Sequence, residues 1–464
     1  MSEKIQTEDQ RRMFIRKQVF ALIIPLMLEQ ILNSLMGMAD TMMVSNVGAE
    51  AISAVALVDS INNLLILVFN AMATGGSIVC AQYLGRKELG EANESARQLV
   101  LSTLTISVVI ALPLCLWARP VLSVIFGQVE RQVMDNSVVY MMISTVSYPF
   151  MSLYSAGAAL MRSEGNSRTP LLISIVSNVL NIAGNAFLIF GLKMGVMGAA
   201  LATLTSRAFS ALVIMILLRR EGHAVILRDY MKFRPDLRRI YLIMSYGIPS
   251  GVENGMFQVG KLLIQSHVSA MGTMAIAANT LAATLEGFES NAPVGVGLAM
   301  MTIVGQCVGA GRFPEAKKHL KTMTFYGEIV VSVMCLLVAL MVRPITVLAG
   351  LDRDTADLTV RLVIIVCSCK PILWAMSFLP SYAFRGAGDV RFPMLVSSFS
   401  MWLCRVAVTL VLIHGFHMGP EAVWYGMATD WFVRSIVFSF HCRKDKWLEY
   451  ARKHTLPSLK GKPA

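Results

Sequence analysis

Twelve long apolar runs dominate this sequence of 464 residues and leave little of the chain outside them. They lie near residues 18–44, 54–79, 98–117, 137–160, 169–191, 196–218, 241–268, 275–304, 322–342, 360–382, 392–414 and 422–441. A helix needs about 20 apolar residues to cross the hydrocarbon core of a bilayer. Only 15% of the residues are charged, whereas a soluble domain has about 25%. We therefore expect an all-α integral membrane protein with twelve transmembrane helices and no large soluble domain.

The distribution of basic residues predicts the orientation of the chain. Twelve helices place both termini on one side, and 30 of the 41 Lys and Arg residues fall in segments expected on that side, against 6 in the opposite segments. Because cytoplasmic loops carry the excess of Lys and Arg, we expect cytoplasmic termini in the inner cell membrane. The net charge of +12 then reflects topology rather than nucleic-acid binding. The polar start of the chain indicates no cleaved signal peptide.

Motifs for enzyme chemistry are missing from the sequence. It contains no phosphate-binding glycine loop, no nucleophile elbow and no HExxH pattern. The eight cysteines lie within or near the apolar runs, which is typical of small buried residues rather than of a disulfide framework. We expect neither an enzyme, nor a metal site, nor a resident cofactor.

An internal repeat divides the chain into two six-helix bundles. At a shift of 224 residues, Pro25 falls on Pro249, Glu29 on Glu253 and Gly48 on Gly272, without a gap over about sixty residues. We expect an N-terminal lobe over 1–218, a cytoplasmic linker over 219–240, a C-terminal lobe over 241–441 and a basic cytoplasmic tail over 442–464. An even number of helices in each lobe gives both lobes the same membrane orientation, related by a pseudo-two-fold axis. Such duplicated bundles favour transport by alternating access.

Several segments together resemble one transporter family. They are IPLMLEQILNSLMGMADTMMVSNVGAEAISAVAL, AQYLGRKE, RSEGNSRTP and SNVLNIAGNAFLIFG, with the second-half counterparts IPSGVENGMFQVGKLLIQSHVSAMGTMAIAANTL, GQCVGAGR and RGAGDVRFP. In this order they are similar to the MATE (multidrug and toxic compound extrusion) family over about residues 13 to 442. The resemblance implies two six-helix lobes in a V that export amphipathic, often cationic organic compounds in exchange for H⁺ or Na⁺.

The resemblance also implies roles for particular residues of the first lobe. Asp40 matches the first-helix carboxylate of the family, and Pro25 matches the proline at which this helix bends. Asn181 and Thr203 match polar residues of the fifth and sixth helices. Asn185 stands where many members carry a second aspartate, a departure that favours H⁺ over Na⁺ as the coupling ion.

The residues themselves predict a polar chamber in the first lobe. At 1.5 Å per residue, Asp40, Asn185 and Thr203 fall at one depth below the outer surface. Asn178, Asn181 and Asn185 share a helix face. Burial of a carboxylate among apolar residues disfavours its charged form, so Asp40, taken as the only carboxylate of this chamber, could load and release a proton. The alternative is a hydrogen-bonded network that serves only packing.

A second polar network is expected in the other lobe. Its members are Asn254, Gln258, Lys261 and Gln265 on one face of the seventh helix, Glu286 and Glu289 on the eighth helix, and Lys370 on the tenth. We expect the charges to pair, with Lys261 bound to an acidic partner. The network then serves either packing or substrate binding and proton coupling. Arg405, Asp430 and Arg434 are expected to pair with one another.

These patterns favour a secondary active exporter, coupled to H⁺ or alternatively to Na⁺, of amphipathic and mainly cationic small molecules. We expect a monomer in the lipid bilayer, without nucleic acid. A flippase of lipid-linked precursors is the alternative within transport, and it would favour a strongly cationic cavity that holds pyrophosphate.

Overall fold

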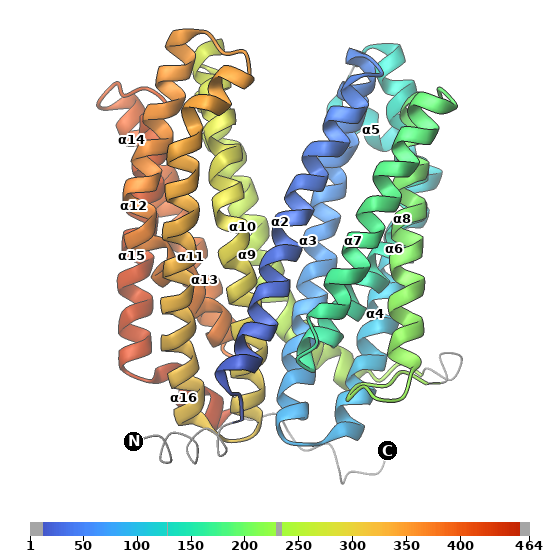
Figure 1. Ribbon diagram of the computed structural model, residues 1–464, viewed down its shortest axis with the longest axis vertical. Helices are drawn as coiled ribbons and strands as arrows, with labels where there is room; N and C mark the ends of the chain where they lie inside the picture. The colour runs from blue at the N-terminus through green and yellow to red at the C-terminus, as the bar shows by residue number, and fades with distance from the viewer. Residues whose placement is uncertain (1–12, 128, 229–233, 455–464) are drawn as a thin grey trace. The chain divides into compact units, whose positions relative to one another are not determined.

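The computed structural model describes residues 13–127, 129–228 and 234–454, and these are almost entirely helical (Figure 1). The elements are α2 (Arg16–Ser45), α3 (Ala49–Gly85), α4 (Leu89–Leu116), α5 (Ala118–Phe126), α6 (Arg131–Ser163), α7 (Arg168–Asn185), η1 (Ala186–Gly191), α8 (Gly195–Arg219), α9 (Leu237–Ser269), α10 (Thr273–Gly309), α11 (Phe313–Leu348), α12 (Arg353–Gly386), α13 (Arg391–Ser400), η3 (Met401–Ala407), α14 (Val408–His414), α15 (Glu421–Arg443) and α16 (Lys446–Lys453). The expectation of an all-helical protein is confirmed.

Nine helices in the described part of the chain are long and apolar enough to cross a membrane. Three further helices, α6, α9 and α15, have 33, 33 and 23 residues but are more polar. Helix α15, for example, carries Asp430 and Arg434 in its middle. The expected multi-pass membrane fold is therefore confirmed.

The chain forms two compact units, and two helices contribute to both. We call residues 32–251 the N-terminal unit, and residues up to 31 together with those from 252 onward the C-terminal unit. Helix α2 changes unit after Ile31, and α9 changes unit after Gly251. Each of these helices contains a proline shortly before the change, Pro25 in α2 and Pro249 in α9. Because proline lacks a backbone donor, both helices are weakened near the point where they leave one unit.

The repeat is visible in the turns that start the second helix of each half. Gly48 precedes α3 with φ of 140°, and Gly272 precedes α10 with φ of 102°. A residue with a β-carbon is strained at such values. The two glycines that the sequence aligns therefore occupy equivalent turns.

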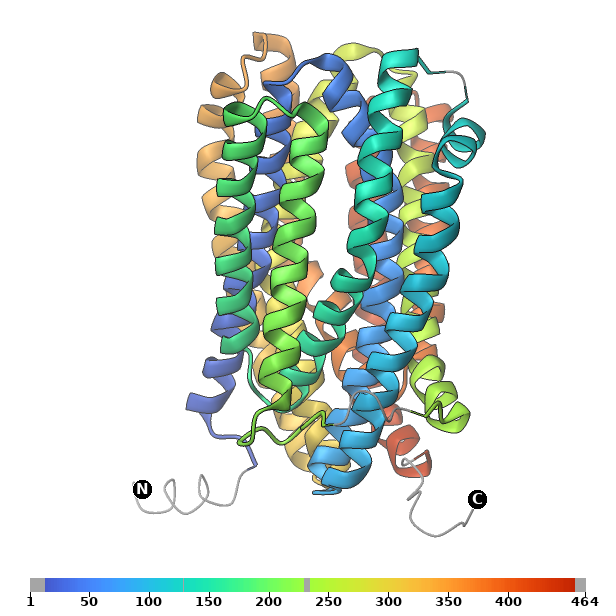
Figure 2. The ribbon, with the colours of Figure 1, turned by 90° about the vertical axis from the view of Figure 1, so that its right-hand side faces the viewer.

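Within the N-terminal unit the helices run side by side, as Figure 2 shows for α7 and α8 in green. The core gathers Val58, Leu122, Met141 and Ile189 from four different helices or helical segments. The C-terminal unit has a larger core, in which Trp374, Trp431 and Phe438 are almost fully buried.

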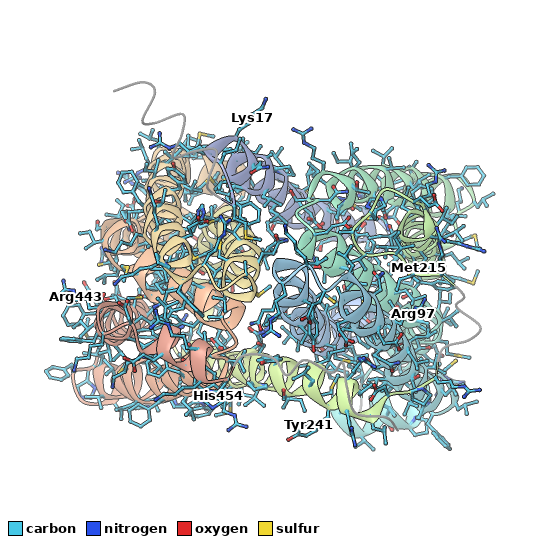
Figure 3. All side chains as sticks on the ribbon, turned by 90° about the horizontal axis from the view of Figure 1, so that it is seen from below. Lys17, Arg97, Met215, Tyr241, Arg443 and His454 are labelled. Carbon is cyan, nitrogen blue, oxygen red and sulfur yellow. The ribbon has the colours of Figure 1, made fainter. Side chains whose placement is uncertain are left out.

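The segment that follows α8 is held against the N-terminal unit by hydrogen bonds. Glu164 accepts the backbone N–H groups of Ala224 and Val225, at 2.9 and 3.2 Å. Arg239, at the start of α9, forms an ion pair with Glu91 at 2.8 Å. This end of the unit is seen from below in Figure 3, where Arg97 and Tyr241 are labelled.

Candidate functional site

Asp40 in α2 meets Asn185 at the end of α7. The Nδ2 atom of Asn185 donates a hydrogen bond of 2.7 Å to Oδ1 of Asp40. Asn185 is 1% exposed, and the backbone beyond it continues as the π-helical segment η1. Such segments occur frequently at functional sites. Two residues expected at one depth in the membrane are thus in direct contact.

The network continues from α7 to α8 through a second asparagine. Asn185 also donates to Oδ1 of Asn181 at 3.0 Å, and Asn181 donates to the hydroxyls of Thr203 at 3.3 Å and Ser206 at 3.5 Å. Asp40, Asn185, Asn181 and Thr203 therefore form one continuous chain of polar groups across three helices. Asn178 makes no hydrogen bond with any other residue that the structure describes.

Asp59 in α3 is a second carboxylate of the same unit, and the sequence interpretation missed it. It lies close enough to Asp40 for electrostatic repulsion. Its Oδ1 accepts hydrogen bonds from Asn62 at 2.9 Å and from the hydroxyl of Tyr140 at 3.5 Å. The assumption that Asp40 alone is charged there is therefore wrong. Asp59 stands inside the apolar run 54–79, and an acidic residue within such a run is the signal that indicates it.

One cation faces these two carboxylates without pairing directly with either of them. Arg207 in α8 interacts electrostatically with Asp40 and Asp59, and its Nη1 donates to Oγ of Ser147 at 2.7 Å. Within the described ranges, neither carboxylate forms an ion pair. The bonded partners of Asp40 and Asp59 are neutral, which suits groups that change their charge.

In the C-terminal unit Lys370 pairs with two carboxylates. Its Nζ lies 3.1 Å from Oε1 of Glu286 and 3.1 Å from Oε2 of Glu289. Lys370 is fully buried and Glu289 is 1% exposed. The expected pairing of charges is present, but Lys370 rather than Lys261 occupies the paired position.

Lys261 and Arg405 instead lie against an aromatic ring. Nζ of Lys261 and Cζ of Arg405 are each 5.2 Å from the centroid of Phe257. Neither cation forms an ion pair with a carboxylate in the described part of the chain. Arg434 pairs with Asp430 at 3.0 Å as expected, whereas Arg405 stays outside that pair.

The amides of α9 are less connected than the sequence predicts. Gln265 accepts a hydrogen bond of 3.1 Å from Asn279 in α10. Asn254 and Gln258 form no hydrogen bond with another described residue. The face of α9 that these amides share with Lys261 is therefore only partly engaged in packing.

The sulfur atoms near Glu289 could hold a metal ion by spacing alone. Cys335 and Cys367 donate to its two carboxylate oxygens at 3.5 and 3.3 Å, and one ligand atom from each of the three residues lies within 4.8 Å of the others. The ammonium of Lys370 is bonded to the same carboxylate and already supplies positive charge there. The arrangement is explained without a metal.

A duplicated set of membrane-spanning helices with ionisable side chains held inside is the architecture of a polytopic membrane transporter, and comparison with known proteins identifies the family. The family model described as MatE matches residues 25–187 and again 249–411. The chain therefore belongs to the MatE family and is a MATE transporter rather than an enzyme. The two matches are offset by the repeat distance that the sequence predicts.

Individual relatives and structures agree with this assignment. The chain is 27% identical over 437 residues to the probable multidrug resistance protein YoeA of Bacillus subtilis, which covers 91% of this chain and 92% of that protein. It is 24% identical over 441 residues to the probable multidrug resistance protein NorM of Thermotoga maritima, with 93% of each chain covered. The crystal structure of MATE in the straight conformation has the same fold, with a TM-score of 0.85, 20% identity, and coverage of 94% and 97%.

Proposed function

We propose that this chain is a secondary active exporter of drug-like organic compounds that exchanges its substrate for H⁺ at Asp40. The observation that carries the proposal is the contact of Asp40 with Asn185, in which a carboxylate inside a membrane helix is bonded to a neutral amide. An ionised carboxylate at this depth costs about 3 kcal/mol or more in lipid. Protonation removes that cost, so binding of a proton and binding of a cationic substrate are alternatives at one group.

Coupling to H⁺ is favoured by the donor groups around Asp40. The Nδ2 of Asn185 points at Asp40, whereas its carbonyl Oδ1 is enclosed without a hydrogen-bond partner in the described structure. A dehydrated Na⁺ needs several oxygen ligands directed at it, and this amide presents its N–H instead. Asp59 adds negative charge to the same unit, which keeps Na⁺ as the alternative to be tested.

Motion between two access states is proposed to use Pro25. A proton on Asp40 changes the charge of α2, and Pro25 makes bending of that helix inexpensive because no backbone hydrogen bond is lost at its nitrogen. Asn181, Asn185 and Thr203 then relay the change to α7 and α8. Asn178, which has no hydrogen-bond partner among the described residues, is proposed to face the transported compound.

The expected substrates are amphipathic and mainly cationic, because an ionised Asp40 attracts a positive group. The names of the Bacillus and Thermotoga relatives, both described as probable multidrug resistance proteins, support drug-like compounds. We further propose cytoplasmic termini in the inner membrane, on the distribution of Lys and Arg. Reporter fusions at both termini test this orientation.

The coupling ion is tested by efflux from proteoliposomes with the H⁺ and Na⁺ gradients imposed separately. We expect efflux of a fluorescent organic cation with a pH gradient in sodium-free buffer, and its collapse when a protonophore is added. Asp40→Asn should reduce efflux to the level of empty liposomes, while Asp135→Asn, a matched change at an exposed carboxylate, should transport normally. Sustained transport on a Na⁺ gradient alone would contradict the proposal.

A further inference from the structure

Two cations of the C-terminal unit, Lys261 and Arg405, have no bonded counterion among the residues that the structure describes. We propose that they form a subsite for the anionic group of an amphipathic organic compound. The ligand class is a carboxylate, sulfonate or phosphate attached to an apolar body. The inference rests on the proposed transport function and extends its substrates from cations to anions and zwitterions.

The evidence for a missing anionic partner is stronger for Arg405 than for Lys261. The residue is 7% exposed, and its Nε is buried without a hydrogen-bond partner. Among the residues that the structure describes, none accepts a hydrogen bond from this guanidinium. Its contact is the ring of Phe257, 5.2 Å from Cζ. Burying a guanidinium with so few partners costs free energy. A ligand anion would supply hydrogen-bond acceptors and a compensating negative charge.

Lys261 places a second positive charge beside the same ring. Its Nζ is 5.2 Å from the Phe257 centroid, and the two cations repel each other. Like charges brought together away from bulk water raise the free energy of the site. An anion that contacts both would remove this repulsion.

The neighbouring carboxylates are already engaged with other cations. Glu286 and Asp430 are the acidic residues that act electrostatically on Arg405. Glu286 is bonded to Lys370 at 3.1 Å, and Asp430 is bonded to Arg434 at 3.0 Å. The region thus holds the four cations Lys261, Lys370, Arg405 and Arg434 and the three carboxylates Glu286, Glu289 and Asp430. The carboxylates are bonded to Lys370 and Arg434, so the excess positive charge lies at Lys261 and Arg405.

The backbone brings the two cations together by a close approach of α9 to η3. A β-carbon on Gly260 would lie 2.5 Å from Cε of Met401 and 3.4 Å from Cγ2 of Val406. Arg405 stands on the π-helical segment η3, as Asn185 of the other unit stands at the start of η1. Irregular turns of this kind recur at functional sites.

The surroundings favour an organic anion over a simple ion. A guanidinium binds a planar carboxylate or a tetrahedral oxyanion through two parallel N–H groups, and an ammonium adds a third donor. The partly exposed ring of Phe257 offers contact to a hydrocarbon or aromatic body. A small hydrated anion would leave this apolar surface unused.

The test is binding of three probes that share a naphthalene body and carry an anionic, a neutral or a cationic group. The full chain in phosphatidylcholine nanodiscs is titrated with naphthalene-2-sulfonate, the neutral naphthalene-2-sulfonamide and a naphthyl trimethylammonium salt, by calorimetry. We expect the sulfonate to bind at least tenfold more tightly than the sulfonamide. Arg405→Gln and Lys261→Gln should each weaken sulfonate binding tenfold or more and leave sulfonamide binding unchanged.

Conservative and matched variants separate binding from folding. Arg405→Lys should retain part of the affinity because the charge is kept and the two-pronged contact is lost. Arg353→Gln, at an exposed arginine of the same unit, should bind like the wild type. Thermal unfolding without ligand should show that Arg405→Gln folds and is no less stable, since it removes an unpaired buried charge.

Two further arms identify the source of the anion. If phosphatidylglycerol in the nanodisc displaces the sulfonate, the same subsite takes an anionic lipid headgroup, which supports the proposed chemistry. If chloride alone competes at equal concentration, or if the sulfonate binds no better than the sulfonamide, the inference is overturned. Asp40→Asn should abolish efflux without changing sulfonate binding, so that failure of the transport proposal and failure of the subsite give different results.

Discussion

The two units hold their charged groups in different ways. In the N-terminal unit, Asp40 and Asp59 are bonded to amides and a phenol, and the cation Arg207 is bonded to a hydroxyl. In the C-terminal unit, Lys370 sits directly between Glu286 and Glu289. A carboxylate with neutral partners is able to change its charge at little structural cost, whereas a salt-bridged one is held in its charged form. The duplicated units thus differ: the two carboxylates of the first have neutral bonded partners, and those of the second are salt-bridged to Lys370.

The largest effect is expected from breaking the fixed network. Lys370→Met should leave Glu286 and Glu289 as unmatched buried charges, at a cost of about 3–5 kcal/mol. Lys261→Met is the matched control, because it removes a lysine of the same unit that forms no ion pair with the described residues. Unfolding midpoints in detergent should fall strongly for the first variant and hardly for the second. Equal losses would mean that Lys370 is not the paired cation.

The sequence predicted the helices and the repeat but not which lysine is paired. Apolar runs and their spacing depend on local composition, so the twelve spans and the aligned turns at Gly48 and Gly272 were accessible. The choice between Lys261 and Lys370 depends on the rotation of α9 and α12 about their axes against α10. Packing between helices sets that rotation, for example where Gly260 approaches Met401. The residue pattern of one helix carries no information about such contacts with another helix.

In the N-terminal unit the sequence predicted part of the polar network, and it missed Asp59. Equal depth assigned Asp40 and Asn185 to one polar chamber, and the structure shows that they are bonded to each other. Asp59 was missed because it is not among the residues that the family resemblance implies, and no depth was assigned to it. The π-helical turns η1 and η3 also escaped prediction, since an extra residue in a helical turn leaves no compositional mark in these apolar segments.

A difference between the two carboxylates of the N-terminal unit sharpens the comparison. Asp59 is held by two donors, Asn62 and Tyr140, whereas Asp40 has one, Asn185. Asp59→Asn should therefore lower the initial rate of pH-driven efflux by several-fold and keep its dependence on the pH gradient. Loss of all coupling in Asp59→Asn, with coupling intact in Asp40→Asn, would exchange the roles of the two residues.

Replacing the neutral partner of Asp40 tests why this unit favours H⁺. Asn185→Asp places a second carboxylate at hydrogen-bond distance from Asp40 and supplies oxygens for a metal cation. We expect efflux of this variant to gain a dependence on Na⁺ that Asn185→Ala lacks. The measurement is the initial efflux rate as a function of Na⁺ concentration at fixed pH. An unchanged rate in both variants would mean that Asn185 does not determine the choice of coupling ion.

The smallest effect is expected from a change at Gly260, where α9 approaches η3 and brings Lys261 and Arg405 together. Gly260→Ala forces Cε of Met401, the end of a flexible side chain, to move by a few tenths of an ångström or more. Sulfonate binding should weaken only two- to threefold, with efflux of organic cations unchanged. A loss as large as that in Arg405→Gln would indicate general misfolding of this unit instead.

The central claim, that substrate and proton are exchanged at Asp40, is tested most directly by counting protons released on substrate binding. The purified chain in a weakly buffered solution with a pH-sensitive dye is mixed with a cationic substrate, below the pH at which Asp40 loses its proton. The account predicts release of about one proton per bound substrate, because a single carboxyl changes its state, the same release from Asp59→Asn, and none from Asp40→Asn. Equal proton release from Asp40→Asn and the wild type would contradict it.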